Sequence, residues 1–310
     1  MHVDDLHRKL LSKVKLLNEN LWEDKIRHPL IAQWLENFTG LCFDSKTERL
    51  YALYLLSQFM YFGEPQIREA LKSLYRDLYQ YPIKKRIRES LNHTHDYSLL
   101  NTEYGRILGR TTFAGVGNPS ESGVHLLYPL RQEAALSKSN FEDATTLAGS
   151  PVDCTSCETH YVLVDDMCGS GVQGKTYLKD RIREIKTKFP GIIVHYYSIL
   201  GTISGLDTLR NELPLDHVDS VFKVDNSYKC FSSPSQIFIA HDPIIHQAEI
   251  EKMCRAYGSQ LWANWPLGYR DGQLLLGFHH NTPDNTLPIM WFDAPGATWI
   301  PVFKRYHKKD

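Results

Sequence analysis

The feature that most constrains the fold is the segment YVLVDDMCGSGVQGKT, residues 161–176. Four apolar residues run directly into two adjacent acids, a loop of small residues follows, and a helical pattern begins near Val172. A strand of a parallel sheet is buried on both faces, so its sequence is continuously apolar. The segment therefore predicts a buried parallel strand over residues 161–165 and, after the loop, a helix over residues 174–188.

The two acids, Asp165 and Asp166, stand at the carboxyl end of this predicted strand. Carboxylates cannot be buried there without partners, because the desolvation of an unpaired charge is costly. In open α/β sheets the ligand crevice lies outside the carboxyl ends of the strands. We therefore expect the acids to meet water, a cation or a polar ligand, and their position favours a ligand.

The loop after the acids is typical of a phosphate cradle. Gly169 and Gly171 let backbone N–H groups approach an anion closely, and the start of the following helix adds free N–H groups and a positive dipole end. Acids that accept hydrogen bonds from hydroxyls, placed directly before such a loop, fit a ribose 5-phosphate. A P-loop ending at Gly174, Lys175 and Thr176 is the alternative, but that motif does not need the acid pair.

The rest of the chain predicts helices first and then alternating strands and helices. Apolar residues recur at helical spacing over residues 6–17, 50–59 and 66–80, and Pro82 is expected to end the last of these helices. The predicted strands lie at 111–117, 161–165, 192–200, 220–225, 235–240 and 274–278. Strands that alternate with helices indicate βαβ units and a parallel sheet.

We therefore expect an α/β protein with a parallel-sheet core and additions at both ends. Residues 1–100 are predicted to form a helical region and residues 101–243 the α/β core. Residues 244–310 begin with a predicted helix and continue as a hood segment that completes the core. The apolar stripes of the first region are expected to be core or an oligomer face, so a homo-oligomer stays open.

Composition gives few signs of a membrane or nucleic-acid partner. The formal net charge is −1, and the basic stretch KDRIREIKTK at 179–188 is interpreted as a solvated helix face. The longest apolar run, 51–62, is too short to span a bilayer, and the amino terminus has no signal-peptide core. We expect a cytoplasmic protein. Cys154 and Cys157 form one CxxC, which is a weak zinc signal and is interpreted as part of a loop.

The motif VLVDDMCGSGVQ resembles the fingerprint of the type I phosphoribosyltransferases, in which an apolar strand, two acids and a loop rich in Thr, Ser and Gly follow one another. The resemblance implies that Asp165 and Asp166 contact the ribose hydroxyls of phosphoribosyl pyrophosphate. It implies that the 5-phosphate is held by Cys168, Gly169, Ser170, Gly171, Val172 and Gln173. The usual second hydroxyl of the loop is absent here, since Gly171 is followed by Val172 and Gln173.

The same resemblance covers an upstream segment, a strand at 111–117, a turn at 118–123 and a helix at 124–136. It implies that this turn binds the pyrophosphate through Ser120, Glu121, Ser122 and Gly123, with Arg131 as a further candidate. Pyrophosphate carries several negative charges, so Mg²⁺ is expected as a bridge, with the two acids as indirect metal ligands. The catalytic loop of the family would lie within residues 140–160, where no strand pair is evident.

The carboxyl-terminal stretch HHNTPDNTLPIMW, residues 279–291, has two interpretations. Asn and Thr commonly cap turns through bonds to the backbone. The other interpretation is a hood that contacts a nucleobase through Phe278, His280, Asn281, Asn285 and Trp291.

With the helical start and the acid-pair loop, this stretch makes the chain similar to phosphoribosyltransferase-like effectors of bacterial conflict and anti-phage systems, including some retrons. That similarity implies partners such as a reverse transcriptase with its RNA–DNA hybrid.

Three functional hypotheses follow from these features. The first is an enzyme that binds phosphoribosyl pyrophosphate or a nucleotide with Mg²⁺ and acts at the anomeric carbon. The second is a ligand-sensing module that keeps the sugar-phosphate site without turnover. The third is a scaffold in a nucleoprotein defence complex, against which the near-zero net charge argues.

Overall fold

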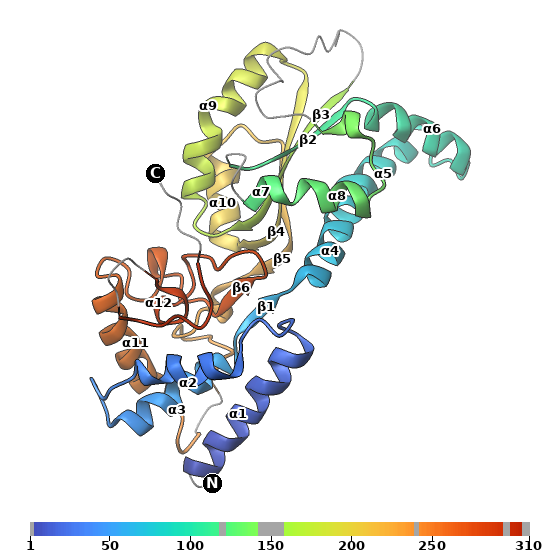
Figure 1. Cartoon of the computed structure of the whole chain (residues 1–310). Helices are drawn as coiled ribbons and strands as arrows, with labels where there is room; N and C mark the ends of the chain where they lie inside the picture. Colours follow the sequence, from blue (N-terminus) through green and yellow to red (C-terminus); the bar gives the residue numbers. More distant parts are fainter. Residues whose placement is uncertain (1–2, 118–121, 142–157, 239–241, 294–297, 306–310) are drawn as a thin grey trace. The chain divides into compact units, whose positions relative to one another are not determined.

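The computed structural model describes residues 3–117, 122–141, 158–238, 242–293 and 298–305. The chain divides into two compact units, each described by itself below. Unit 1 comprises residues 1–65 and 225–310, and unit 2 comprises residues 66–224. Both are shown in Figure 1.

Unit 2 contains the predicted parallel sheet. Its four strands, in the spatial order β2-β3-β4-β5, are all parallel. The strands are β2 (Thr111–Gly115), β3 (Thr159–Cys168), β4 (Ile192–Thr202) and β5 (His217–Val224). The helices of this unit are α4 (Glu64–Ser73), η1 (Leu74–Gln80), α5 (Tyr81–Ser90), α6 (Tyr97–Leu108), α7 (Ser122–His125), α8 (Leu127–Glu133), η2 (Lys138–Asn140), α9 (Val172–Lys188) and α10 (Ile203–Glu212). The chain therefore has the α/β fold that the sequence predicts.

Helices cover both faces of this sheet, which is why its central strands are continuously apolar. On one face, α9 and α10 pack on β3 and β4, as Figure 1 shows. Leu178 and Ile182 of α9 share a buried cluster there with Tyr161, Leu163 and Tyr196. On the other face, Tyr79 of η1 meets the sheet edge-on and lies 5.3 Å from Phe113, between ring centroids.

Two helix predictions in unit 2 were wrong. Pro82 does not end the helix before it, because η1 is a π-helix that continues directly into α5. The Tyr81 N–H bonds the Arg76 carbonyl five residues back, and Pro82 then falls in the first turn of α5, where its missing N–H is not needed. The helix predicted at 124–136 is divided at Leu126 into α7 and α8, and Pro129 lies in the first turn of α8.

Unit 1 is built around an aromatic core from both ends of the chain. Its elements are α1 (Val3–Asn20), α2 (His28–Glu36), α3 (Ser45–Leu56), β1 (Met60–Phe62), η4 (Asn226–Tyr228), α11 (Gln247–Leu261), η5 (Tyr269–Asp271), β6 (Leu276–Phe278) and α12 (Pro288–Trp291). The Trp34 indole donates to the Ile289 carbonyl, 2.8 Å away, and Phe59 stacks on Phe303. The predicted strand at 274–278 is confirmed as β6, which pairs in parallel with β1.

The strand predicted at 235–240 was wrong over its described part. Residues 235–238 form an irregular, bent segment, because their polar groups bond locally. Ser235 N–H donates to the Ser232 carbonyl and Gln236 N–H donates to the Ser227 carbonyl, which leaves no backbone groups for strand pairing.

The grouping of residues 1–65 with 225–310 differs from the three-part division expected from the sequence. Among the described residues, no helix combines the length and the apolar character needed to cross a bilayer.

Candidate functional site

The acid pair lies inside β3, which runs three residues beyond the predicted strand and ends at Cys168. Successive residues of a strand point to opposite faces of the sheet, so Asp165 and Asp166 lie on different faces. Asp165 shares the α9 and α10 face with Tyr196, whose hydroxyl donates to Asp165 Oδ2 at 2.7 Å. Its other oxygen, Oδ1, accepts from the Asp166 N–H at 2.9 Å.

The electrostatic environment of Asp165 disfavours its ionised form. Burial raises the pKa of Asp165 well above its usual range, and the neighbouring Asp166 carboxyl raises it further. The hydrogen bond from Tyr196 acts in the opposite direction without cancelling these effects. An acidic side chain with a strongly raised pKa is typical of a functional site. Its position at the carboxyl ends of parallel strands, where α/β proteins bind ligands, supports the same interpretation.

Cys168 follows the acids and is buried on the same side as Tyr196. Burial and the nearby Asp165 raise the pKa of the Cys168 thiol to about 12. A thiol with this pKa stays protonated at neutral pH, so Cys168 is not a thiolate nucleophile. Within the 5-phosphate loop that the resemblance implies, Cys168 therefore offers backbone groups.

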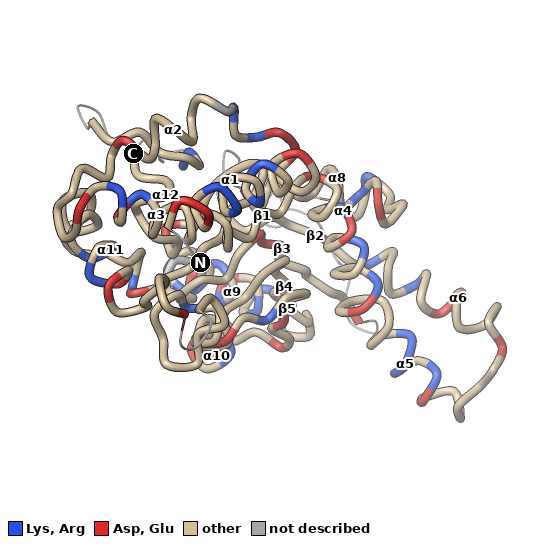
Figure 2. The backbone as a smooth tube through the Cα atoms, turned by 90° about the horizontal axis from the view of Figure 1, so that it is seen from below, with Lys and Arg blue, Asp and Glu red and all other residues tan. Residues whose placement is uncertain are grey.

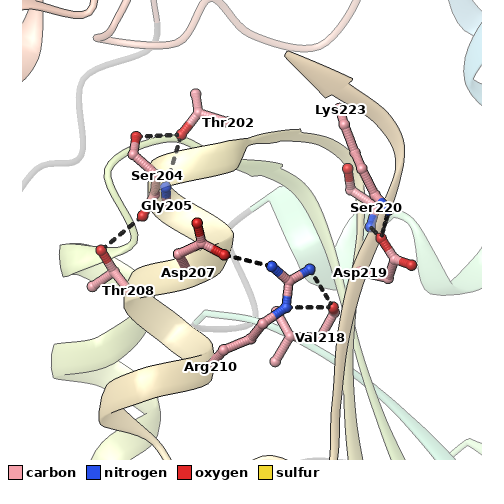
Figure 3. Close-up of polar contacts among 10 residues, drawn as sticks. All are labelled: Thr202, Ser204, Gly205, Asp207, Thr208, Arg210, Val218, Asp219, Ser220 and Lys223. Atoms are coloured by element: carbon pink, nitrogen blue, oxygen red, sulfur yellow. Dashed lines mark hydrogen bonds and ion pairs between the residues drawn. The ribbon is translucent and has the colours of Figure 1, made fainter. Parts of the chain in front are cut away.

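The glycine loop is packed tightly against the start of α10. Thr202 caps α10 by accepting from the Gly205 N–H, and its hydroxyl donates to the Gly169 carbonyl at 2.5 Å. Figure 3 shows this cap, with Ser204 beside Thr202. A Cβ on Gly205 would lie 2.1 Å from the Gly169 carbonyl oxygen. One on Gly171, which has a φ of +73°, would lie 2.6 Å from the Gly205 carbonyl oxygen. The amino ends of α9 and α10 are thus held side by side at the acid pair.

Residues 169–176, GSGVQGKT, also satisfy the spacing of a nucleotide-binding P-loop. In a P-loop the residues between the glycines wrap the phosphates and the lysine reaches them. Here α9 already begins at Val172, and Lys175 forms an ion pair with Glu212 of α10. The local geometry therefore favours a short loop of three residues, 169–171, over a P-loop. The Val172 N–H lies 3.5 Å from Ser170 Oγ, and the Gln173 side chain lies outside the described residues.

The predicted pyrophosphate turn falls largely outside the described residues. Ser120 and Glu121 are not described, nor is the Ser122 side chain, although Ser122 begins α7. Gly123 packs directly on the sheet, because a Cβ there would lie 2.3 Å from the Val116 carbonyl oxygen. Arg131 lies on α8, where its Nε is buried without a hydrogen bond. It lines a pocket of about 460 Å³ with Tyr128, Gln132, Ala135 and Leu136.

The five predicted base-binding residues all belong to unit 1, where bonds within the fold hold several of them. Asn285 donates to the Tyr269 carbonyl and the Trp291 indole donates to the Thr286 carbonyl. Phe278 is buried in β6, His280 stacks on it, and Asn281 accepts from the Thr282 N–H. These contacts fit the turn-capping interpretation of the segment. The base-binding role stays a prediction.

Sequence reasoning missed Tyr196 and Thr202. Tyr196 stands in an apolar run that gives no sign of its bond to Asp165. Thr202 had a usable signal, since it precedes a helix as an N-cap residue, but β4 was expected to end at residue 200. Charge offers no further guide, because Figure 2 shows Lys and Arg interspersed with Asp and Glu along the helices of each unit.

The donor set at the acid pair fits Mg²⁺ only as a bridge to a ligand. Mg²⁺ is usually held by one or two carboxylates together with substrate phosphates. Among the described residues, no group of three or more His, Cys, Asp or Glu side chains could hold a metal by itself. Asp165 and Asp166 both lie at this edge, and Asp166 already has an interaction of its own.

Comparison with known proteins identifies a matching family. Residues 31–305 match the family model described as PRTase-CE, which is of the phosphoribosyltransferase type. No curated protein and no solved structure matches the chain.

Proposed function

Because the chain belongs to the PRTase-CE family, which is of the phosphoribosyltransferase type, we propose that it binds phosphoribosyl pyrophosphate or a nucleotide and acts at the ribose anomeric carbon. The observation that carries this proposal is the carboxyl of Asp165, whose ionised form is disfavoured, beside the tightly packed glycine loop at 169–171. Both lie at the carboxyl edge of a parallel sheet, where α/β proteins bind ligands.

In this proposal Asp165 and Asp166 bind the ribose hydroxyls, and the loop at 169–171 binds the 5-phosphate. Hydroxyl groups donate to carboxylates, which would offset part of the cost of burying Asp165. The 5-phosphate lies at the amino end of α9, where free N–H groups and the helix dipole favour an anion. Thr202 positions the loop from the side of α10, since its hydroxyl bonds the Gly169 carbonyl.

The chemistry assigned to the acids is electrostatic. When the bond from the anomeric carbon to its leaving group lengthens, positive charge develops on the ribose ring. Ribose hydroxyls that donate to Asp165 favour its ionised form, and carboxylates fixed in advance then stabilise the developing charge without reorganisation. Mg²⁺, held through pyrophosphate and the acids, would neutralise charge on the leaving group.

The proposed biological role is anti-phage defence, and it is based on the resemblance to effectors of bacterial anti-phage systems. A cytoplasmic, conditionally toxic protein restrained by partner components, such as a reverse transcriptase with its RNA–DNA hybrid, fits that resemblance. The second candidate function is a sensor that binds the same ligand without turnover. It is favoured by the 140–160 segment, whose sequence has no evident strand pair for a catalytic loop.

The first experiment is isothermal titration of phosphoribosyl pyrophosphate with Mg²⁺ into the wild type and the Asp165→Asn/Asp166→Asn variant. The matched control is Asp180→Asn/Asp207→Asn, which removes the same charge from exposed positions on α9 and α10. We expect the acid-pair variant to bind about 100-fold more weakly, since it loses hydrogen bonds to charged groups, and the control to bind normally. Absence of binding by folded wild type would refute the ligand assignment.

Turnover then separates the enzyme from the sensor. Candidate bases and nucleotides are incubated with the wild type, and products are resolved by chromatography. Release of pyrophosphate or of a free base by the wild type, with loss of release in the acid-pair variant, supports the enzyme. Binding without product from any of them supports the sensor.

A further inference from the structure

A tyrosine of the neighbouring strand reaches the acid pair from inside the fold. Tyr196 of β4 is 1% exposed, and its ring packs in the buried cluster that includes Leu163 and Leu206. Strand pairing places Leu163, two residues before Asp165, directly beside Tyr196. The side chains of Asp165 and Tyr196 therefore lie on the same face of the sheet. There the Tyr196 hydroxyl lies 2.7 Å from Asp165 Oδ2.

The hydrogen bond between these two side chains runs from the tyrosine to the carboxyl group. Burial raises the pKa of Tyr196 well above its usual range, and the nearby Asp165 carboxyl raises it further. The hydroxyl therefore keeps its proton and is the donor. Because side chains in a close-packed interior have few alternative positions, this donor is in place before any ligand binds.

An aspartate carboxyl group needs such donors to keep one orientation, because rotation about its terminal torsion is broad. Two donors restrict it here. The Tyr196 hydroxyl bonds Oδ2, and the Asp166 N–H bonds Oδ1 at 2.9 Å. One donor at each oxygen fixes the plane of the carboxyl group. Without Tyr196, the Asp166 N–H alone would leave the group free to turn about that single bond.

The fixed orientation leaves acceptor capacity on both oxygens of Asp165. A carboxylate offers about four lone-pair sites, and these two donors use one on each oxygen. Asp165 is only partly shielded from solvent, so a ligand can reach it. The two oxygens of one carboxylate can accept from two neighbouring donors at once, as they do in bidentate pairs with arginine. The two adjacent ring hydroxyls of a ribose are such a pair of donors.

We propose that Tyr196 is a positioning residue of the sugar-phosphate site: it holds Asp165 so that both carboxylate oxygens face the two adjacent ring hydroxyls, and it thereby sets a preference for ribose over 2-deoxyribose. This inference rests on the proposed function, since it requires that Asp165 contacts the sugar. Tyr196 does not touch the ligand. It acts through the orientation of Asp165, as side chains that support a binding residue do.

The test compares ribose 5-phosphate with 2-deoxyribose 5-phosphate by calorimetry, for the wild-type full chain and for Tyr196→Phe. The wild type should bind the ribose compound at least about tenfold more tightly, because the deoxy sugar lacks one hydrogen bond to a charged group. In Tyr196→Phe that ratio should fall to about threefold or less. The matched control is Tyr197→Phe, which removes a buried hydroxyl that bonds His195 on the same strand, and it should keep the wild-type ratio.

Two further measurements separate positioning from a general loss of structure. Inorganic phosphate, which would occupy the loop at 169–171 without a sugar, should bind Tyr196→Phe as it binds the wild type. Asp165→Glu keeps the charge but moves the carboxyl group by one methylene from its place beside the Tyr196 hydroxyl, so it should lose the preference for ribose as well. If Tyr196→Phe does not fold, Asp165→Glu carries the test, and full preference in that variant would overturn the inference.

The outcomes distinguish this inference from the proposed function. If the folded wild type binds neither sugar phosphate nor phosphoribosyl pyrophosphate, the proposed function fails and this inference fails with it. If the wild type prefers ribose 5-phosphate and Tyr196→Phe keeps that preference, the proposed function stands and Tyr196 is not a positioning residue. Equal binding of the two sugars by the wild type, or an equal loss of preference in Tyr197→Phe, would also overturn the inference.

Discussion

Each unit contains a carboxylate shielded from solvent, Glu48 completely and Asp165 in part, and the environments of the two are opposite. Glu48 of unit 1 has no exposed surface and accepts four hydrogen bonds. Burial alone would raise the pKa of Glu48, but the Tyr257 hydroxyl and three backbone N–H groups hold that pKa below its usual value. Asp165 of unit 2 accepts two bonds and lies beside another acid, so its pKa rises.

The difference separates a structural acid from a functional one. Glu48 is ionised and satisfied within the fold, and it ties the loop at 40–43 to the start of α3. Asp165 has hydrogen-bonding capacity left over, which the fold does not use. Burial by itself therefore says little about function, whereas an unmet need for partners identifies the site.

The largest expected effect is the loss of Glu48. Glu48→Ala leaves three N–H groups and the Tyr257 hydroxyl without their acceptor, which should lower the free energy of unfolding of unit 1 by about 3–5 kcal/mol. All six tryptophans belong to unit 1, so tryptophan fluorescence in urea follows this unit alone.

Tyr257→Phe provides the graded control for Glu48, because it removes a single donor from the same carboxylate. A loss of about 1.5–3 kcal/mol is expected, smaller than that of Glu48→Ala. Equal effects of the two variants would mean that the backbone bonds to Glu48 contribute nothing, and the structural interpretation of this acid would be wrong.

The second effect is a pH dependence of unit 2 from His160, one of its two buried histidines. Because the pKa of His160 is lowered to about 4 from a usual 6.5, the unfolded chain binds more protons between these values. Stability is therefore full above pH 6.5 and falls as the pH drops toward 4, by about 3 kcal/mol, since one pKa unit is worth about 1.4 kcal/mol.

Hydrogen exchange of peptides from β3 and β4, corrected for the intrinsic effect of pH, measures this loss. His160→Asn should reduce the slope on the acid side of the profile, and the remaining slope should come from His195, whose pKa burial also lowers. An unchanged slope in that variant would assign the pH dependence to other groups of the unit.

The third effect compares two glycines three residues apart. Gly171→Ala places a side chain at a φ of +73° and 2.6 Å from the Gly205 carbonyl oxygen, which should cost about 2 kcal/mol and disturb phosphoribosyl pyrophosphate binding. Gly174→Ala lies inside α9 with its nearest neighbour, Leu209 Cδ2, at 3.5 Å, and should stabilise by about 0.5–1 kcal/mol. Urea-dependent hydrogen exchange of α9 peptides and titration of the ligand distinguish the two. Similar behaviour of both would show that the loop needs no glycine.

The sequence predicted those features that one continuous segment encodes. The apolar run before Asp165 identified β3, and the small residues after it identified the loop and the helix. Alternating strands and helices identified the parallel sheet. The acids lie within β3, because the strand continues to pair with β4 as far as Cys168.

Features that depend on distant residues were not predictable from a pattern. Unit 1 is held by contacts such as Trp34 to Ile289, which are 255 residues apart. The row formed by His160, His195 and His217 exists only because strand register brings these residues of β3, β4 and β5 together. The bond from Tyr196 to Asp165 depends on the same register. No local periodicity carries that information.

The last expected effect bears most directly on the comparison between the two acids. The pKa of Asp165 is raised in the folded state, so its contribution to stability is present below the unfolded pKa of about 3.9 and is lost as the pH rises. Asp165→Asn removes the carboxyl whose ionisation the fold disfavours, while the side-chain amide oxygen still accepts from Tyr196, and it should stabilise unit 2 at pH 7 by about 1 kcal/mol. Hydrogen exchange of β3 peptides measures the gain. Glu48→Gln should instead lower the free energy of unfolding of unit 1. If Asp165→Asn also destabilised its unit, Asp165 would be a structural acid like Glu48.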